Sequence, residues 1–156
     1  MVYIYIMNRC PQCNAIAKAG HRCKLKTCKF APKCYHHTPV QVQQSNIPGA
    51  GRGLFAKRDI RSGEKIADYT LGTQQLTQQM FDMRYPDGRA THVAQVHGTY
   101  YDASNSSKSI AGMANRAPSG SARNSAKINQ NGGVVTTRQV RKGQEIYLSY
   151  GRSYRL

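Results

Sequence analysis

Short segments in which apolar and polar residues alternate dominate this chain, and turn residues bound most of them. Two of these turns predict hairpins, a two-residue turn at His97-Gly98 and a longer one at 130–132. The predicted strands lie at 53–56, 64–72, 92–96, 99–103, 125–129, 133–138 and 143–151. Many short strands separated by turns indicate a mainly β fold of small packed sheets, and not alternating α/β layers.

Helical periodicity is much rarer than this alternation. The best predicted helix covers residues 74–83, where Leu76, Met80 and Met83 would share one face. The apolar N-terminal residues 1–7 alternate as a strand does, and they lack the basic leader and length of a signal peptide. No apolar run reaches 18 residues, so we expect no membrane span.

Composition divides the chain into two parts. All five cysteines precede residue 45, whereas the acidic residues begin only at Asp59. With 156 residues, the chain is long enough for one domain with a real core and one small appendage. We therefore predict a Cys/His module at 1–40, a main domain at 41–156, and a short linker near 38–44.

The net charge is +16, from 23 Lys and Arg against 7 Asp and Glu. Such a balance favours acidic partners, nucleic acid first. A basic surface that only keeps the protein soluble explains the charge equally well.

Three glycines at alternate positions, 49, 51 and 53, raise the question of a phosphate-binding loop. A dinucleotide loop needs a third glycine at position 54 or 56, where Leu54 and Ala56 stand, and a Walker loop needs Gly-Lys-Ser/Thr. Neither pattern fits. The glycines instead predict a turn whose backbone approaches something closely.

The N-terminal module concentrates thiols and imidazoles in the stretch CPQCNAIAKAGHRCKLKTCKFAPKCYHH. An odd number of cysteines without a signal peptide argues against a disulfide scaffold and for a reducing, intracellular setting. Tetrahedral zinc suits such a segment, which has few core residues of its own. The residues leave open which four bind; one set built on the CPQC knuckle is Cys10, Cys13, Cys28 and Cys34.

This stretch also resembles the small Cys/His modules of large DNA viruses, which read C-x-A-x-x-K-x-G-x-x-C with a final C-x-x-H. The resemblance implies the zinc ligands Cys13, Cys23, Cys34 and His37. It also implies a viral protein, which could act in the nucleus of a host cell.

The main domain resembles the SET domain, the family of S-adenosylmethionine-dependent protein-lysine methyltransferases. Residues 47–69 resemble its opening, G-x-G-x-F-A followed by a turn and G-E-x-I-x-x-Y. YYDAS, SIAGMANRA with RNSAKI, and RQVRKGQEIYLSYG then resemble its I-D-A, R-F-I-N-H-S with P-N-A, and closing G-E-E-I-x-x-x-Y-G segments. These motifs occur in the family's order, between about residues 45 and 152.

The resemblance implies a SET fold with a knot-like C-terminal crossing and a single catalytic residue, Tyr150, whose hydroxyl would orient the substrate amine. A side chain on Gly53 is expected to occupy space that the cofactor needs. The residues that the resemblance implies for binding S-adenosylmethionine are Gly51, Arg52, Gly53, Leu54, Asn115, Arg116 and Tyr150.

Some residues depart from the family pattern. Arg116 replaces the family's His, Gly112 replaces an Arg and is expected to loosen its segment, and Leu148 replaces a Phe or Tyr. The resemblance implies methylation of lysine on histones or other proteins, with contact to nucleosomal DNA through the basic surface. A partner chain, as in a homodimer, could close the cofactor site. The alternative function is an inactive SET-fold zinc protein that binds chromatin or nucleic acid.

Overall fold

The structure is a computed structural model, and it describes residues 10–118 and 123–149. The strand predicted at residues 1–7 lies outside this range, as does Tyr150. Within the described residues, no helix combines the length and apolar character needed to cross a membrane.

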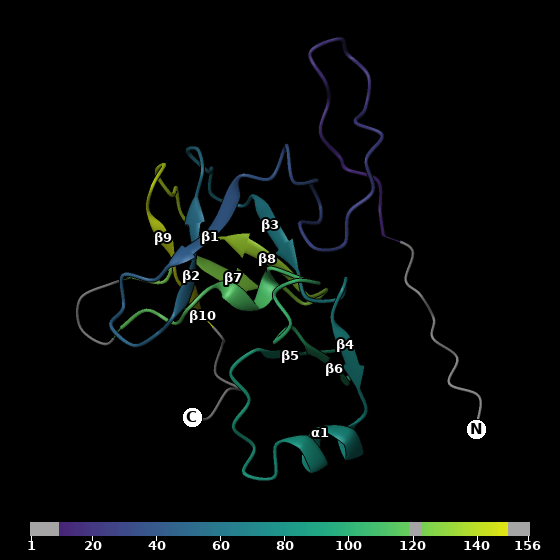
Figure 1. Ribbon diagram of the computed structural model, residues 1–156, viewed down its shortest axis with the longest axis vertical. Coiled ribbons are helices and arrows are strands. Elements are labelled where there is room, and N and C mark those ends of the chain that lie inside the picture. Colours follow the sequence, from purple (N-terminus) through teal and green to yellow (C-terminus); the bar gives the residue numbers. More distant parts are fainter. Residues whose placement is uncertain (1–9, 119–122, 150–156) are drawn as a thin grey trace.

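The first sheet has the order β1-β2-β9 and carries the glycine turn between its first two strands (Figure 1). β1 (Val40–Gln44) pairs antiparallel with β2 (Arg52–Ala56), which pairs antiparallel with β9 (Glu145–Ile146). The linker predicted near residues 38–44 is therefore wrong, because most of that segment is β1. As the edge strand, β1 leaves Gln43 and Gln44 exposed, which explains its polar sequence.

The second sheet has the order β10-β7-β8-β3. β7 (Ala126–Ile128) and β8 (Gly133–Thr136) form the second predicted hairpin, and Gly132 takes a positive φ of 85° in its turn. β3 (Lys65–Asp68) pairs antiparallel with β8, while β10 (Leu148–Ser149) pairs parallel with β7. The short segment β9-β10 thus joins the first sheet to the second.

The third sheet has the order β4-β6-β5, and its strands are β4 (Gln74–Leu76), β5 (Val93–Val96) and β6 (Thr99–Asp102). Its hairpin turns at His97 and Gly98, both with positive φ, as a two-residue turn that follows the strands' twist requires. This confirms the first predicted hairpin.

The only α-helix among the described residues, α1 (Gln78–Arg84), begins later than predicted. Thr77 caps it by accepting a hydrogen bond from the Met80 amide at 3.2 Å, and this cap separates the helix from β4. Leu76 is consequently buried on a strand, while Met80 and Met83 are exposed. The predicted apolar helix face is therefore wrong.

Asp102 fixes α1 to the third sheet. Its Oδ2 accepts hydrogen bonds from Arg84 Nη1 at 3.0 Å and from the Tyr85 hydroxyl at 2.8 Å. Burial alone would raise the pKa of Asp102, but hydrogen bonds from Ser104, Tyr85 and Arg84 hold it below its ordinary value. Burial and the neighbouring carboxylate raise the pKa of Tyr85 to about 12. The pair is therefore an anionic Asp102 and a neutral Tyr85 at neutral pH.

The core lies between the sheets, and the closing strands supply part of it. Leu54, Ile146 and Leu148 are fully buried in one cluster with Tyr69. Residue Asn115 pairs parallel with Tyr147, next to these strands. The mainly β fold of small packed sheets predicted from the sequence is thus confirmed.

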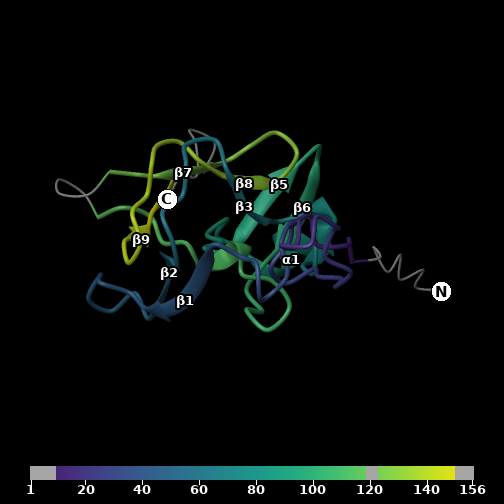
Figure 2. The ribbon, with the colours of Figure 1, turned by 90° about the horizontal axis from the view of Figure 1, so that it is seen from above.

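Residues 10–39 form an irregular appendage that lies on one side of the sheets, drawn in purple in Figures 1 and 2. It is held to the main body through its last turns. The Ile110 amide donates to the Lys29 carbonyl at 3.1 Å, and Phe30 packs against the main core. The division at residue 40 stays a prediction.

Candidate functional site

The turn between β1 and β2 presents open backbone. Gly49 and Gly51 have φ of 77° and 69°, and a Cβ built on either meets nothing within 4 Å. The Ser45 amide donates to the Gly51 carbonyl at 2.8 Å, which fixes the turn's shape. Because Gly51 is both constrained and exposed, its backbone can approach a ligand closely. The role of this turn in cofactor binding stays a prediction.

Gly53 is a glycine for a different reason from the one expected. A Cβ at this position would overlap the Glu145 carboxylate and lie 3.3 Å from Asn115 Nδ2. The space beside Gly53 is therefore filled by the protein, so the expectation that a side chain would displace the cofactor directly is wrong. Leu54 is fully buried in the core, and Arg52 is exposed.

Glu145 holds the glycine turn, a role that sequence reasoning missed. Its carboxylate accepts hydrogen bonds from Ser45 Oγ at 2.6 Å and from the Asn46 amide at 2.8 Å. It also accepts from Asn115 Nδ2 at 3.2 Å and from the Tyr147 hydroxyl at 3.3 Å. The residue is only 7% exposed. Glu145 is therefore a positioning residue that joins the closing strand to the start of the turn.

Tyr147 lies beside this carboxylate, and its ionisation is suppressed. Burial and the negative charge of Glu145 raise the pKa of the Tyr147 hydroxyl. Tyr147 is consequently neutral at physiological pH, and its hydroxyl donates a hydrogen bond to Glu145.

Asn115 links the turn to the closing strand from the other side. Its side-chain amide donates to the Arg52 carbonyl at 2.9 Å, and its backbone carbonyl accepts from the Leu148 backbone amide at 2.8 Å. The structure thus places Asn115 beside Arg52 and Gly53, and their shared role in cofactor binding stays a prediction. The Arg116 side chain is exposed. Tyr150 lies outside the described residues, so its catalytic role stays a prediction.

Gly112 is tightly packed, contrary to the expectation that it loosens its segment. It is buried, and a Cβ there would lie 2.6 Å from the Ala103 carbonyl oxygen. The Gly112 carbonyl and His92 Nδ1 are 2.8 Å apart. The glycine therefore permits a close crossing of the segment before Asn115 with the strand that ends at Asp102.

The appendage gathers four sulfur and nitrogen ligands at one point. The ligand atoms of Cys13, Cys23, Cys34 and His37 all lie within 4.8 Å of one another. Cys34 Sγ is 3.2 Å from His37 Nδ1 and 4.0 Å from Cys23 Sγ. Two sulfurs bound to one tetrahedral zinc lie about 3.8 Å apart. The donor set and its spacing therefore fit zinc.

The environment of Cys13 favours the thiolate that a metal needs. Burial raises its pKa, but hydrogen bonds from the Ala15 and Cys34 backbones and from His37 outweigh burial and leave it at about 6. Burial raises the pKa of Cys34. The exposed His21 and His36 lie outside the cluster.

The other two cysteines, Cys10 and Cys28, form a disulfide with a Cα–Cα distance of 4.8 Å. This pairing differs from the expectation, because the odd number of cysteines argued against disulfides. The alternative ligand set with Cys10 and Cys28 is not assembled, because these two sulfurs are bonded to each other and lie outside the four-residue cluster.

The close contact at Gly53 yields a prediction. Gly53→Ala is expected to lower the free energy of unfolding by about 1–3 kcal/mol, because its Cβ displaces the Glu145 carboxylate. Affinity for S-adenosylmethionine should fall as well, since the turn loses its anchor. Urea denaturation and calorimetry measure the two effects.

The control is a double-mutant cycle with Glu145→Ala, which vacates the space that the new methyl group needs. We expect the double variant to lose less stability than the sum of the two single losses, by at least about 0.5 kcal/mol. Additive losses would show that the Gly53–Glu145 contact does not set the turn.

Solved structures of two other proteins share this fold. The structure of ctPRC2 in an autoinhibited conformation bound to S-adenosylmethionine gives a TM-score of 0.54 at 18% identity, over 75% of this chain and 16% of that one. The structure of PFL0690c, a candidate histone methyltransferase of Plasmodium falciparum, gives 0.53 at 16% identity, over 76% of this chain and 97% of that one. The chain thus spans less than a fifth of the ctPRC2 chain and nearly all of the chain in the second structure.

Curated protein sequences gave no significant match. The family comparison gave a match: the SET domain matches residues 51–151, which is more than half of the chain and includes Gly51, Gly53, Asn115 and Glu145. The match, the fold and the assembled turn agree, and the chain belongs to the SET-domain family.

Proposed function

We propose that this chain is an S-adenosylmethionine-dependent protein-lysine N-methyltransferase that acts on histones. The observation that carries the proposal is the open, positive-φ backbone at Gly51, held by Glu145 and Asn115 in a chain of the SET family. The open backbone of this turn, in a chain of this family, supports retained cofactor binding.

When bound, S-adenosylmethionine supplies a methyl group activated on a positively charged sulfur. Gly51 and Arg52 would hold its methionine end through backbone groups, and Asn115 and Arg116 would support the rest. The enzyme's remaining task is to align a neutral lysine amine and exclude water. Tyr150 would orient that amine by its hydroxyl, and a dry channel would favour the neutral form of the lysine.

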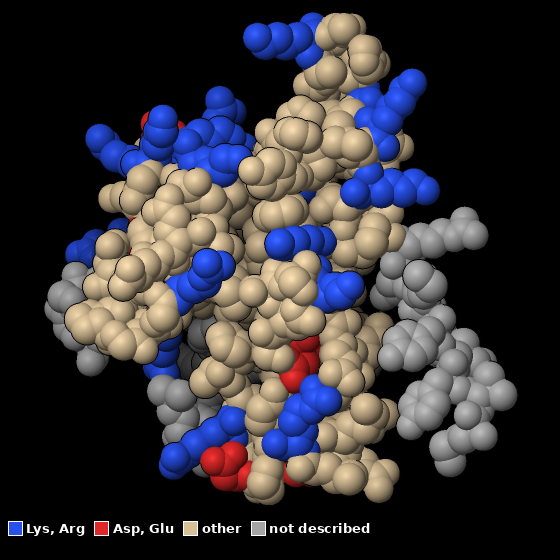
Figure 3. Space-filling model, in the orientation of Figure 1, with Lys and Arg blue, Asp and Glu red and all other residues tan. Residues whose placement is uncertain are grey.

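A histone substrate is proposed from charge. The protein carries +16, and Figure 3 shows Lys and Arg spread over the displayed face with few acidic side chains among them. A basic enzyme is repelled by free histone tails but attracted to the DNA around which histones are wrapped. The charge supports nucleosomes over isolated histones as the proposed substrate, and a nucleosome substrate would require the protein to act in a nucleus.

The test is binding of S-adenosylmethionine by titration calorimetry, followed by methyl transfer to nucleosomes and to free histones. We expect saturable binding near one equivalent and methylated lysine by mass spectrometry. The apparent affinity of the enzyme for nucleosomes should fall steeply as salt rises, while its apparent affinity for free histones should not. A folded protein without detectable cofactor binding would refute the proposal and leave the inactive, chromatin-binding alternative.

A further inference from the structure

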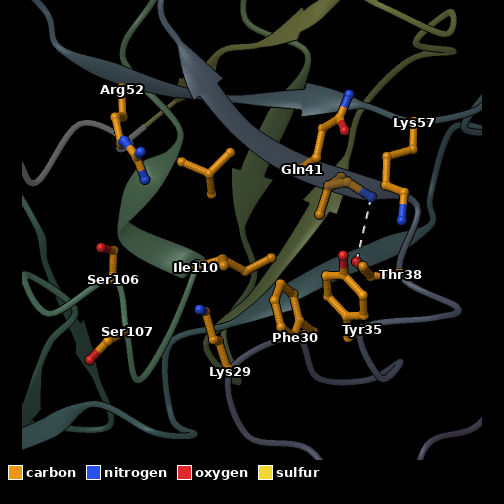
Figure 4. A pocket seen from close by; sticks show the side chains of 12 residues that line it. Lys29, Phe30, Tyr35, Thr38, Gln41, Arg52, Lys57, Ser106, Ser107 and Ile110 are labelled. Carbon is orange, nitrogen blue, oxygen red and sulfur yellow. Dashed lines mark hydrogen bonds between the residues drawn. The ribbon is translucent and has the colours of Figure 1, made fainter.

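A cleft lies between the appendage and the first sheet, and Arg52, the residue that follows Gly51, lies in its lining (Figure 4). Its volume is about 490 Å³, within the range of pockets that hold a nucleotide-sized ligand. Val42 and Ile110 contribute apolar surface to it. Ser106 and Ser107 add hydroxyl groups. The cleft is therefore amphipathic, with room for one flat apolar group.

Three cationic side chains surround this cleft, and none is neutralised by a carboxylate. Figure 4 shows Arg52 and Lys57 on opposite sides, with Lys29 between them and lower. No acidic residue lines the cleft. Among the described residues, the ion pairs use other cations, such as Arg58 with Glu64. The cleft therefore presents concentrated positive charge to a ligand.

Two aromatic rings line the same cleft. The centroids of Phe30 and Tyr35 are 5.7 Å apart in an edge-to-face arrangement, and Tyr35 is 65% exposed. Lys29 Nζ lies 5.2 Å from the Phe30 ring, and Lys57 Nζ lies 5.6 Å from the Tyr35 ring. An exposed aromatic ring beside unpaired cations is the combination that binds an unstacked base and its phosphates.

We propose that this cleft binds single-stranded nucleic acid, with phosphates on Lys29, Arg52 and Lys57 and a base on Tyr35. In a duplex the bases are stacked inside, so a duplex would use the cations and leave the rings idle. An acidic peptide would also meet the cations, but it lacks the flat π surface that suits Tyr35 and the apolar floor. The single strand is the partner that uses both the cations and the aromatic rings of the cleft.

The appendage supplies one wall of this site. Phe30 packs against the main core, and the Lys29 carbonyl accepts from the Ile110 amide, so this wall is fixed relative to the sheet. Tyr35 follows Cys34 directly in the predicted zinc cluster. The Cys/His module therefore has a use beyond its own stability, because it holds the stacking ring over the cleft.

The test measures fluorescence anisotropy of a labelled twelve-nucleotide thymidine oligomer with the full-length protein, without cofactor or histone. Methyl transfer takes no part in this measurement, so its outcome is independent of the proposed enzyme activity. Tyr35→Leu should weaken binding roughly 5- to 150-fold, because one stacked base is lost. Tyr35→Phe keeps the ring and should bind as the parent does. A plot of log affinity against log salt has a negative slope, and Lys29→Gln and Lys57→Gln should each make that slope shallower by about 0.7.

Lys24→Gln and Lys142→Gln are the matched controls, because both lysines are exposed and lie outside the cleft. They should change the affinity much less than Lys29→Gln and Lys57→Gln do. Zinc content is measured in both Tyr35 variants. If Tyr35→Leu loses zinc, the affinities of the Lys29→Gln and Lys57→Gln variants decide whether the cleft is the binding site. Equal losses in controls and cleft variants would overturn the site. Tighter binding of a duplex or a polyglutamate peptide, lost in the same cleft variants, would overturn the single strand as the partner.

Discussion

Replacing Tyr150 with Phe is expected to lower the rate of methyl transfer by about 100-fold or more, while cofactor affinity and folding stability stay close to those of the parent. Phenylalanine keeps the aromatic ring, so we expect little change in folding. Only the hydroxyl is lost, and with it the group predicted to orient the amine toward the methyl group. Single-turnover assays on nucleosomes measure the rate, and calorimetry and thermal unfolding measure the other two quantities.

Tyr100→Phe is the matched control for this change. It removes a hydroxyl that donates to Gln78 Oε1 at 2.9 Å in the third sheet, on an exposed contact. We expect its rate to equal that of the parent. If Tyr150 had only a structural role, Tyr150→Phe would instead lose stability and keep its rate per folded molecule. A Tyr150→Phe protein as fast as the parent would remove the catalytic assignment.

The elements that local chemistry determines could be predicted from the sequence. His97-Gly98 allows the positive φ values of a tight turn, so the hairpin around it was correctly located. The helix near residue 80 was predicted too early because Leu76 fits a helical period as well as a strand. Thr77, a strong N-cap residue in front of the helix, carried the better signal.

The edge strand and the glycine turn show where local patterns fail. VQVQQ at 40–44 reads as a linker because its glutamines are polar, yet an edge strand exposes half of its side chains to water. The reason for glycine at 53 is a carboxylate 92 residues later in the chain, at Glu145. Such a contact follows from the tertiary fold, so no local pattern could have predicted it.

The four implied zinc ligands were predicted through resemblance, and the structure gathers them at one point. Spacing alone could not choose among the cysteines, because Cys10 and Cys28 also have plausible ligand spacing. Their disulfide removes them from the choice. Zinc itself and the viral origin stay predictions.

Cys34→Ser is expected to release the metal and unfold residues 10–39, whereas Cys28→Ser should retain one equivalent of zinc. Cys34 is buried, and its Sγ lies beside both His37 and Cys23, so its loss would remove one of the four gathered ligands. A structural zinc contributes apparent binding energy on the order of 10 kcal/mol at neutral pH, and an appendage with few core residues depends on it. Elemental analysis and limited proteolysis measure metal content and folding.

The pair of serine variants decides between the two ligand sets because the chemical change is the same in both. The cluster of Cys13, Cys23, Cys34 and His37 predicts loss of zinc only in Cys34→Ser. The alternative set with Cys10 and Cys28 predicts loss in both. In Cys34→Ser the sheets should keep their cooperative unfolding, since Leu54, Ile146 and Leu148 form a core without the appendage. Less than half an equivalent of zinc in the parent protein, or a Cys34→Ser protein that keeps its metal and resists proteolysis, would refute the zinc assignment.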